Sequence, residues 1–220
     1  MEIFKTADGS HSLHSEQFNV SYHSKYGAIQ ETQHVFIEAG LRPKALIQKE
    51  VSVLGIGFGT GLNALMTCLE AGQRNIKINY VAVEAFPISM ETVNQLNFGG
   101  LFEQENVQDI FLKLHESEWN ETIQVTENFT FKKLNQKFED LSFEPQFDVV
   151  YFDAFSPTTQ PELWETPVLK IMYDSLLPNG FLTTYCAKGV VKRTMKAIGF
   201  TVEGLPGPPG KREMTRAVKA

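Results

Sequence analysis

The amino-acid sequence predicts an α/β fold with a doubly wound, mostly parallel sheet, and two observations carry this prediction. Short apolar, β-favouring runs alternate along the chain with longer segments of helical character, which is typical of a parallel sheet covered by helices. The runs Ile78–Val83 and Phe147–Phe152 are almost continuously apolar, as expected for strands buried on both faces. Ligands of such folds bind outside the carboxyl ends of the strands, so the residues that follow each strand are the candidate site.

Composition indicates a single domain without a membrane-spanning segment. The 220 residues suit one domain, and hydrophobic residues make up 42%, enough for a buried core. No apolar run approaches the roughly 20 residues of a membrane span, and the first residues lack the pattern of a signal peptide. Cys68 and Cys186 lie in predicted core elements and are expected as buried thiols rather than a disulfide. We therefore expect a cytoplasmic protein with no membrane partner.

The N-terminal region, residues 1–45, is expected to form an arm and a helix packed on a core of residues 46–220. Residues 1–28 contain few apolar residues and many Ser and His, so we expect a loose arm with a short hairpin near its end. His11 and His14 are spaced like a metal pair, but no further ligand cluster supports them, so no metal site is expected.

The segment Val51–Asn63 reads Val-Ser-Val-Leu-Gly-Ile-Gly-Phe-Gly-Thr-Gly-Leu-Asn and predicts a strand, a tight turn and the start of a helix. Glycines let the backbone adopt positive φ and a ligand approach closely, and a helix N-terminus offers unpaired N–H groups. The dinucleotide fingerprint Gly-x-Gly-x-x-Gly fails, because Thr60 and Leu62 stand where its last glycine would fall. The remaining pattern, Gly-x-Gly-x-Gly from Gly57 to Gly61, looks like the first motif of class I methyltransferases, which bind S-adenosylmethionine. A turn needed only for packing is the alternative.

The other elements are expected in regular alternation. Helices are predicted over Ile29–Gly40, Leu62–Ala71, Phe86–Asn97, Leu101–Trp119, Glu162–Leu177 and Gly189–Ile198. Core strands are predicted over Val51–Leu54, Ile78–Val83, Phe129–Leu134, Phe147–Phe152, Phe181–Tyr185, Phe200–Glu203 and Met214–Val218. The last two strands are expected to be joined as in a hairpin.

Acidic residues follow several of these strands and are expected to meet in one crevice. Glu84 lies 23 residues beyond Gly61, where a carboxylate can accept hydrogen bonds from both hydroxyls of a ribose. Phe86 could flank an adenine ring, and Asp140 could accept a hydrogen bond from its amino group. A solvated loop acid or a core aromatic ring is the alternative at each position.

Asp153 is the predicted catalytic residue. It follows the apolar run Phe147–Phe152 directly and opens a proline-punctuated loop. If a methyl acceptor is an amine, a carboxylate here can orient its N–H bonds, stabilise the ammonium product or accept a proton. Phe155 and Trp164 could stack on a flipped base. A turn-capping aspartate and core aromatic residues are the alternatives.

Charge is distributed unevenly along the chain. The net charge of −6 argues weakly against a nucleic-acid partner, yet residues 181–220 carry +6 and the remainder −12. Basic side chains gathered at one end can form a phosphate-binding patch, and a solvated helix face is the alternative.

Four motifs together resemble one family, the methyltransferase domain of the bacterial MnmC and MnmD enzymes, which complete 5-methylaminomethyl-uridine at the wobble position of tRNA. The motifs are Gly57–Asn63, Glu31-Thr32 before Val35-Phe36, Asp153-Ala-Phe-Ser-Pro157 with Pro161-x-x-Trp164, and Lys211-Arg-Glu-Met214. The resemblance covers nearly the whole chain.

This resemblance implies a class I S-adenosylmethionine-dependent methyltransferase that acts on the aminomethyl group of the wobble uridine, with the tRNA anticodon arm as partner. It implies neither a metal nor FAD, and an aminomethyl-uridine substrate supplied by a separate enzyme. The cofactor residues expected are Gly57, Phe58, Gly59, Thr60, Gly61, Asn63, Glu84, Phe86, Asp140, Glu31 and Thr32. The acceptor-binding residues expected, beside Asp153, are Phe155, Pro157, Trp164, Lys188, Arg193, Lys211 and Arg212.

Two departures from the family's pattern bear on this interpretation. The family usually has Glu where Gly55 stands, which affects the expected contact to the amino-acid end of the cofactor. The best-known members also carry a flavin-dependent oxidase domain, so a stand-alone methyltransferase form is expected here. A transferase that acts on a small amine, a non-catalytic binding module and a nicotinamide oxidoreductase are the competing interpretations, the last disfavoured by the failed fingerprint.

Overall fold

The fold is described by a computed structural model that covers residues 1–220. Its main strands are β4 (Glu50–Ile56), β5 (Lys77–Glu84), β6 (Thr122–Thr126), β7 (Phe129–Asn135), β8 (Phe147–Phe152), β9 (Leu176–Thr184), β10 (Phe200–Pro206) and β11 (Glu213–Lys219). Its α-helices are α1 (Ala28–Thr32), α2 (Arg42–Ala45), α3 (Leu62–Arg74), α4 (Met90–Val93), α5 (Val107–Glu116), α6 (Thr166–Ser175) and α7 (Gly189–Ile198). A π-helix, η1 (Gln33–Leu41), joins α1 to α2, so Ala28–Ala45 is one helical segment. Short 3₁₀ turns are η2 (Phe98–Gly100), η3 (Phe138–Asp140) and η4 (Pro161–Trp164).

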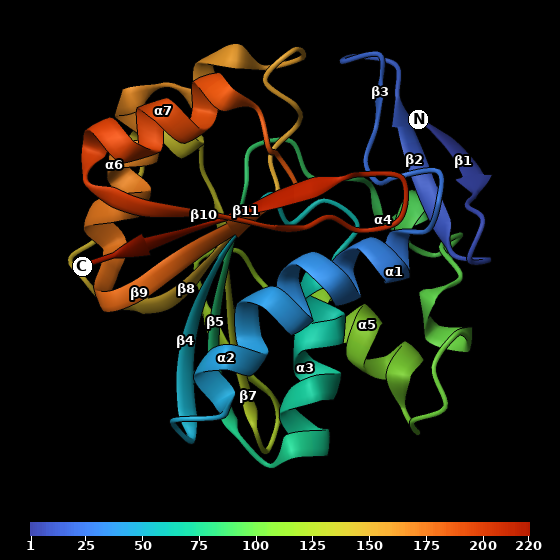
Figure 1. The fold of residues 1–220 in the computed structure, drawn as a ribbon. Helices are drawn as coiled ribbons and strands as arrows, with labels where there is room; N and C mark the ends of the chain where they lie inside the picture. The colour runs from blue at the N-terminus through green and yellow to red at the C-terminus, as the bar shows by residue number, and fades with distance from the viewer.

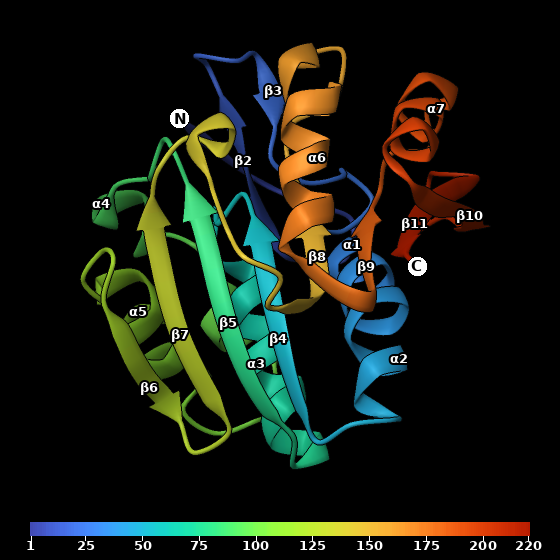
Figure 2. The same ribbon diagram turned by 90° about the vertical axis from the view of Figure 1, so that its left-hand side faces the viewer.

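These strands form one eight-stranded sheet in the order β10-β11-β9-β8-β4-β5-β7-β6 (Figure 2). The five central strands, from β9 to β7, pair in parallel, and the flanking pairs are antiparallel. The predicted α/β sheet is therefore confirmed. The chain runs from β4 outward to β5 and β7 and then returns to β8, so the topological switch point lies beside β4. A ligand crevice is expected there.

Helices cover both faces of the sheet (Figures 1 and 2). The segment α1–η1–α2 lies with α3 and α5 on one face, and α6 and α7 lie on the other. Each face has its own hydrophobic cluster, of 33 and 21 buried residues, so the parallel strands are apolar toward both sides. This explains why Phe147–Phe152 is apolar at almost every position.

The N-terminal arm is ordered, which corrects the prediction of a loose arm. Strands β1 (Glu2–Lys5), β2 (His11–Ser15) and β3 (Val20–Ser21) form a separate antiparallel sheet. Its polar side chains bond to one another: the Asp8 carboxylate accepts from Thr6 and Ser10 and also from the backbone N–H of Gln30 in α1. Internal hydrogen bonds therefore replace the hydrophobic pattern that would have revealed these strands in the sequence.

Several predicted boundaries are also corrected. Helix α4 is only one turn long, because Pro87 and the Ser89 N-cap precede it; the predicted helix covered Phe86–Asn97. Helix α5 starts only after Asn106, which adopts a left-handed conformation with φ of 61°. Strand β9 includes Pro178–Gly180, which had been expected to close a helix.

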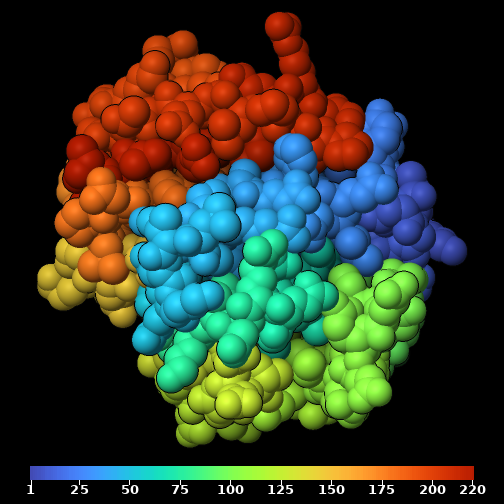
Figure 3. Space-filling view, turned by 60° about the horizontal axis from the view of Figure 1, so that its bottom comes forward, coloured from blue at the N-terminus to red at the C-terminus, as the bar shows by residue number.

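The two ends of the chain meet on one side of the molecule. The β10–β11 hairpin lies along the α1–η1 segment, and the space-filling view shows these C-terminal and N-terminal segments in contact (Figure 3). His34 Nε2 donates to the carbonyl of Pro206 at 2.8 Å, and Lys211 Nζ lies 2.7 Å from a carboxylate oxygen of Glu31. No helix is both long and apolar enough to cross a bilayer.

Candidate active site

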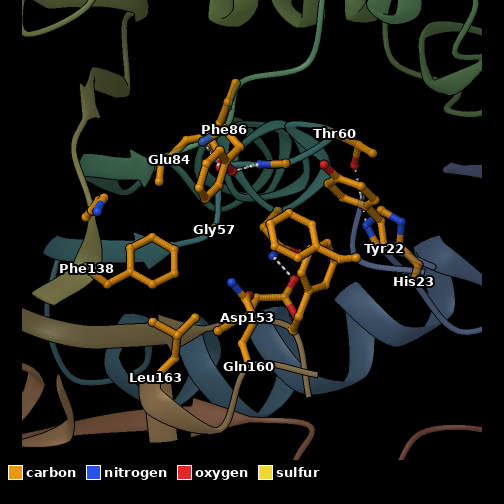
Figure 4. A pocket seen from close by; sticks show the side chains of 18 of the residues that line it. Tyr22, His23, Gly57, Thr60, Glu84, Phe86, Phe138, Asp153, Gln160 and Leu163 are labelled. Atoms are coloured by element: carbon orange, nitrogen blue, oxygen red, sulfur yellow. Dashed lines mark hydrogen bonds between the residues drawn. The ribbon is translucent and has the colours of Figure 1, made fainter. Parts of the chain in front are cut away.

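A cavity of about 300 Å³ opens at the carboxyl ends of β4, β5, β7 and β8, the place that the topology predicts. Figure 4 shows Glu84 and Phe86 at one end of this cavity, with Asp153 on another wall. Eight further predicted or neighbouring residues belong to its lining: Gly57, Phe58, Gly59, Thr60, Leu62, Asn63, Ala154 and Phe155. The glycine loop, the acid after β5 and the acid after β8 are thus brought together.

The glycine loop needs its glycines for conformation and for space. Gly57, Gly59 and Gly61 have φ of 86°, 51° and 77°, in the left-handed region that disfavours other residues. A Cβ on Gly57 would lie 2.9 Å from the carbonyl oxygen of Asp153, so the loop and the end of β8 are in direct contact. Gly61 precedes Leu62, the first residue of α3, so the helix N-terminus faces the cavity.

Glu84 supports the loop as well as lining the cavity. One carboxylate oxygen accepts from the Gly59 N–H at 2.9 Å, and the other accepts from the Phe86 N–H at 2.8 Å. The backbone N–H groups of Gly57 and Phe58 both donate to the carbonyl of Val83 in the same strand. Each Glu84 oxygen keeps a second lone-pair direction for a ligand hydroxyl.

Asp153 is held by a short chain of hydrogen bonds. Asn63 Nδ2 donates to Asp153 Oδ2 at 2.8 Å, and Asn63 Oδ1 accepts from Thr32 Oγ1 at 2.9 Å. The Thr32 bond fixes which end of the Asn63 amide faces the carboxylate. Asp153 Oδ1 takes part in no hydrogen bond, so it remains available to a substrate.

Burial raises the pKa of Asp153 from 3.8 to about 7. The negative charge of Glu31 raises it further, whereas the Asn63 hydrogen bond and the positive charge of Lys211 lower it. A carboxyl group whose pKa lies near neutrality is well matched to accepting a proton from an amine.

Glu31 and Lys211 form an ion pair behind Asp153. Glu31 is buried, and its other oxygen accepts from the Ser24 N–H. Lys211 Nζ also lies 3.8 Å from the ring centre of Tyr185, whose hydroxyl donates to the carbonyl of Ala154. Lys211 is therefore committed to the site's own structure, which corrects its expected place on the acceptor-binding surface.

Aromatic side chains from two distant segments cover the cavity. Phe18 lies 5.6 Å from Phe86 and 5.3 Å from Phe155, measured between ring centres, and Tyr22 lies 5.2 Å from Phe155. We call Phe18, Tyr22 and Phe155 the aromatic cover. Only Phe155 was predicted from the sequence.

The sequence analysis missed six other lining residues: Phe18, Tyr22, His23, Phe138, Gln160 and Leu163. The first three belong to the arm whose order was not foreseen. Burial lowers the pKa of His23 to about 4, so its ring is neutral near pH 7, and it lies within 3.4 Å of the Thr60 hydroxyl. The aromatic residues Phe18 and Tyr22 in an otherwise polar arm were the available signal.

Some predicted residues lie outside the cavity. Asp140 is exposed in η3 and does not reach it, whereas its neighbours Phe138 and Glu139 do. Glu31 and Thr32 lie behind the wall and act through Lys211 and Asn63. Gly61 shapes the loop without lining the cavity.

The expected stacking role of Trp164 is not supported. Its side chain is 3% exposed and packs on Phe152, and its ring N–H donates to the carbonyl of Phe155 at 2.8 Å. Trp164 thereby fixes the loop that carries Phe155. Pro157 lies with Trp164 in a separate shallow groove beside α7.

The predicted basic residues divide into two groups. Lys188, Arg193 and Arg212 are exposed and form no ion pair, and Lys188 Nζ is within 3.3 Å of Thr158 in the loop after Asp153. Lys211 is paired internally, as described above. The exposed group is free to meet phosphates.

Comparison with known proteins identifies the fold and a family. A family model described as S-adenosyl-L-methionine-dependent methyltransferase matches residues 102–220, more than half of the chain. Among solved structures, MNMC2 from Aquifex aeolicus superposes with a TM-score of 0.80 at 24% identity, covering 98% of this chain and 69% of that one. DesVI from Streptomyces venezuelae has a TM-score of 0.53 at 13% identity, covering 87% and 92%.

Curated relatives carry one recurring name. Proteins from Leptospira borgpetersenii and Cupriavidus necator, each named tRNA 5-methylaminomethyl-2-thiouridine biosynthesis bifunctional protein MnmC, are 28% identical over 215 and 217 residues. The matches cover 91% and 93% of this chain and 32% of each relative. The chain therefore spans about a third of the length of these relatives.

Proposed function

This chain belongs to the S-adenosyl-L-methionine-dependent methyltransferase family, and we propose that it methylates the aminomethyl amine of 5-aminomethyl-uridine, or its 2-thio form, at the tRNA wobble position. The product is 5-methylaminomethyl-uridine or its 2-thio form. The observation that carries the proposal is Asp153, a buried carboxylate with one free oxygen beside the glycine loop, in a chain similar to enzymes named for this nucleoside.

The residues around the cavity fit an adenosine-containing cofactor. Side chains at Gly57 or Gly59 would fill the cradle that the loop forms, and Glu84 presents carboxylate oxygens for ribose hydroxyls. Phe86 is 47% exposed beside Glu84, where it offers a ring face to a base. When bound, S-adenosylmethionine supplies a methyl group on a sulfonium centre, which an amine lone pair can displace.

Asp153 orients the acceptor amine and then takes its proton. The free Oδ1 accepts an N–H of the neutral amine, which directs the nitrogen lone pair away from the carboxylate. After transfer, the nitrogen is positively charged, and the adjacent carboxylate stabilises this charge and accepts a proton. The neighbouring amide of Asn63 holds the carboxylate in place throughout.

The tRNA is expected to approach over the exposed cations. Lys188, Arg193 and Arg212 lie around the cavity side of α7 and the β10–β11 hairpin, where anticodon-arm phosphates could contact them. The target base enters by leaving its stack, as single-stranded loop bases do. We propose further that another enzyme supplies the aminomethyl group, and that neither a metal nor FAD takes part.

The test is transfer of label from S-adenosylmethionine to tRNA taken from cells that lack this modification, followed by digestion to nucleosides. Label in 5-methylaminomethyl-uridine or its 2-thio form, absent with Asp153→Ala, supports the proposal. Asp140→Asn, an exposed carboxylate near the cavity, is the matched control and should leave transfer unchanged. Cofactor binding with transfer only to small amines would overturn the tRNA assignment.

A further inference from the structure

Gly55, in β4 directly before the glycine loop, has no room for a side chain. A Cβ built there would collide with the Tyr80 hydroxyl and lie 2.8 Å from Cζ of the same ring. Tyr80 reaches across from the neighbouring strand β5, because Ala82, the partner of Gly55 in the register, is small. The family's usual glutamate at this position would therefore be displaced by Tyr80, and the two positions must change together.

The Tyr80 hydroxyl is an unexplained polar group. Tyr80 is 3% exposed, and its hydroxyl forms no hydrogen bond with the protein. The hydroxyls of Tyr151 and Thr183 are unpaired and fully enclosed, whereas that of Tyr80 is not fully enclosed. A nearly buried hydroxyl without a partner costs about 1–3 kcal/mol, so such a group calls for a ligand or water to pair with it.

The position of this hydroxyl favours one part of the cofactor. It lies at Gly55 in β4, on the face covered by α3, whereas the predicted ribose and adenine contacts, Glu84 and Phe86, lie at the end of β5. Burial raises the pKa of Tyr80 well above its usual value, and the charge of Asp153 contributes to this shift. The hydroxyl is therefore a neutral donor on the Asp153 side of the site.

We propose that the Tyr80 hydroxyl is the polar group that binds the amino-acid end of the cofactor, in the space that Gly55 leaves open. The proposal rests on the family's cofactor but not on the tRNA substrate. Tyr80 is thus a positioning residue: it fixes the tail of the cofactor, which helps to hold the reacting end against Asp153.

Two product analogues separate this role from others. S-adenosylhomocysteine carries the amino-acid tail, and 5′-methylthioadenosine lacks it while keeping the adenosine and the thioether. Tyr80→Phe should weaken S-adenosylhomocysteine about tenfold, the effect of one lost hydrogen bond. It should change 5′-methylthioadenosine less than twofold. Titration calorimetry on the full chain measures both, and the melting temperature without ligand should not fall, since no internal hydrogen bond is lost.

Tyr173→Phe is the control, because Tyr173 packs on Phe200 at α6, away from the cavity. It should leave both affinities unchanged. Equal affinities of Tyr80→Phe and the unmodified protein for S-adenosylhomocysteine would overturn the proposal. So would an equal loss for both analogues, which would place Tyr80 at the adenosine, or a failure of the unmodified protein to bind either. Failure of methyl transfer to tRNA would leave these binding results intact and would count only against the tRNA assignment.

Discussion

The two sides of the cavity are built by different means. The glycine loop and Glu84 are joined by backbone hydrogen bonds within two adjacent strands and the turn between β4 and α3. The opposite side consists of the aromatic cover and the Lys211–Glu31 pair, which are side-chain contacts between segments up to 180 residues apart. A backbone cradle depends little on side-chain identity, whereas a side-chain cover can change with the acceptor. The first side therefore suits a cofactor shared by a whole family, and the second suits substrate selection.

Asp153 lies where the two sides meet, and its replacement should have the largest effect. Asp153→Asn should lower the transfer rate about 1,000-fold, within the range for losing a general base. The raised pKa means that the folded protein holds this proton more tightly than the unfolded chain. Asp153 therefore favours folding at low pH, and this contribution is lost as pH rises from 3.8 toward about 7.

Removing the charge should consequently stabilise the protein on the alkaline side. Asp153→Asn should raise the melting temperature by about 5 °C at pH 8 and by much less at pH 4, as measured by calorimetry across pH. A gain that is the same at both pH values would contradict the raised pKa.

Gly57→Ala tests the backbone-built side. The new Cβ would meet the Asp153 carbonyl, and φ of 86° disfavours alanine, so affinity for S-adenosylhomocysteine should fall about 100-fold. The free energy of unfolding should fall by about 1–3 kcal/mol. Gly72→Ala, in α3 with no atom within 4 Å of its Cβ, should instead be neutral or stabilising by up to about 1 kcal/mol. Denaturant unfolding and calorimetry measure these effects.

Lys211→Met tests the side-chain-built side. Loss of the positive charge should raise the pKa of Asp153 further, so the acid limb of the pH–rate profile should move to higher pH. The rate at pH 7 should fall about tenfold, as for a shift of one pKa unit, and recover at higher pH. Arg212→Met, exposed and unpaired, should weaken tRNA binding without moving the profile. If both variants weaken tRNA binding alike and neither moves the profile, Lys211 is a phosphate contact after all.

Phe18→Ala should have the smallest effect and should separate the two sides. Loss of its contacts with Phe155 and Phe86 should raise the KM for tRNA about fivefold, matching about 1 kcal/mol for an aromatic pair. Affinity for S-adenosylhomocysteine should change less than twofold. Phe143→Ala, which removes an edge contact to Phe147 outside the cavity, is the control for general destabilisation. Equal losses for tRNA and cofactor would show that the cover belongs to both sites.

The sequence predicted what depends on local pattern and missed what depends on long-range contact. The strand-turn-helix unit, Glu84 and Asp153 were located correctly, because each follows a strand whose apolar pattern is visible along the chain. Phe18 and Tyr22 were missed because their strands are held by serine and aspartate hydrogen bonds, which leave no apolar period. Asp140 was misplaced because the strand before it ends at Asn135 and a 3₁₀ turn intervenes.

Trp164 and Lys211 illustrate a second limit. Both belong to the predicted motifs, yet their burial and ion pairing place them inside the protein's own framework. A motif shows that a residue type is required at a position. It does not show whether that residue contacts the ligand or supports one that does.

The Lys211–Glu31 pair also has a consequence for synthesis of the protein. A ribosome makes the glycine loop and Asp153 well before residue 211, so a nascent chain has the cradle and the carboxylate but lacks the cation that faces them. Contacts of such long sequence separation form late and slowly. The active centre is therefore among the last parts of the molecule to be completed, and a chain released before its final hairpin would hold Glu31 buried without its countercharge.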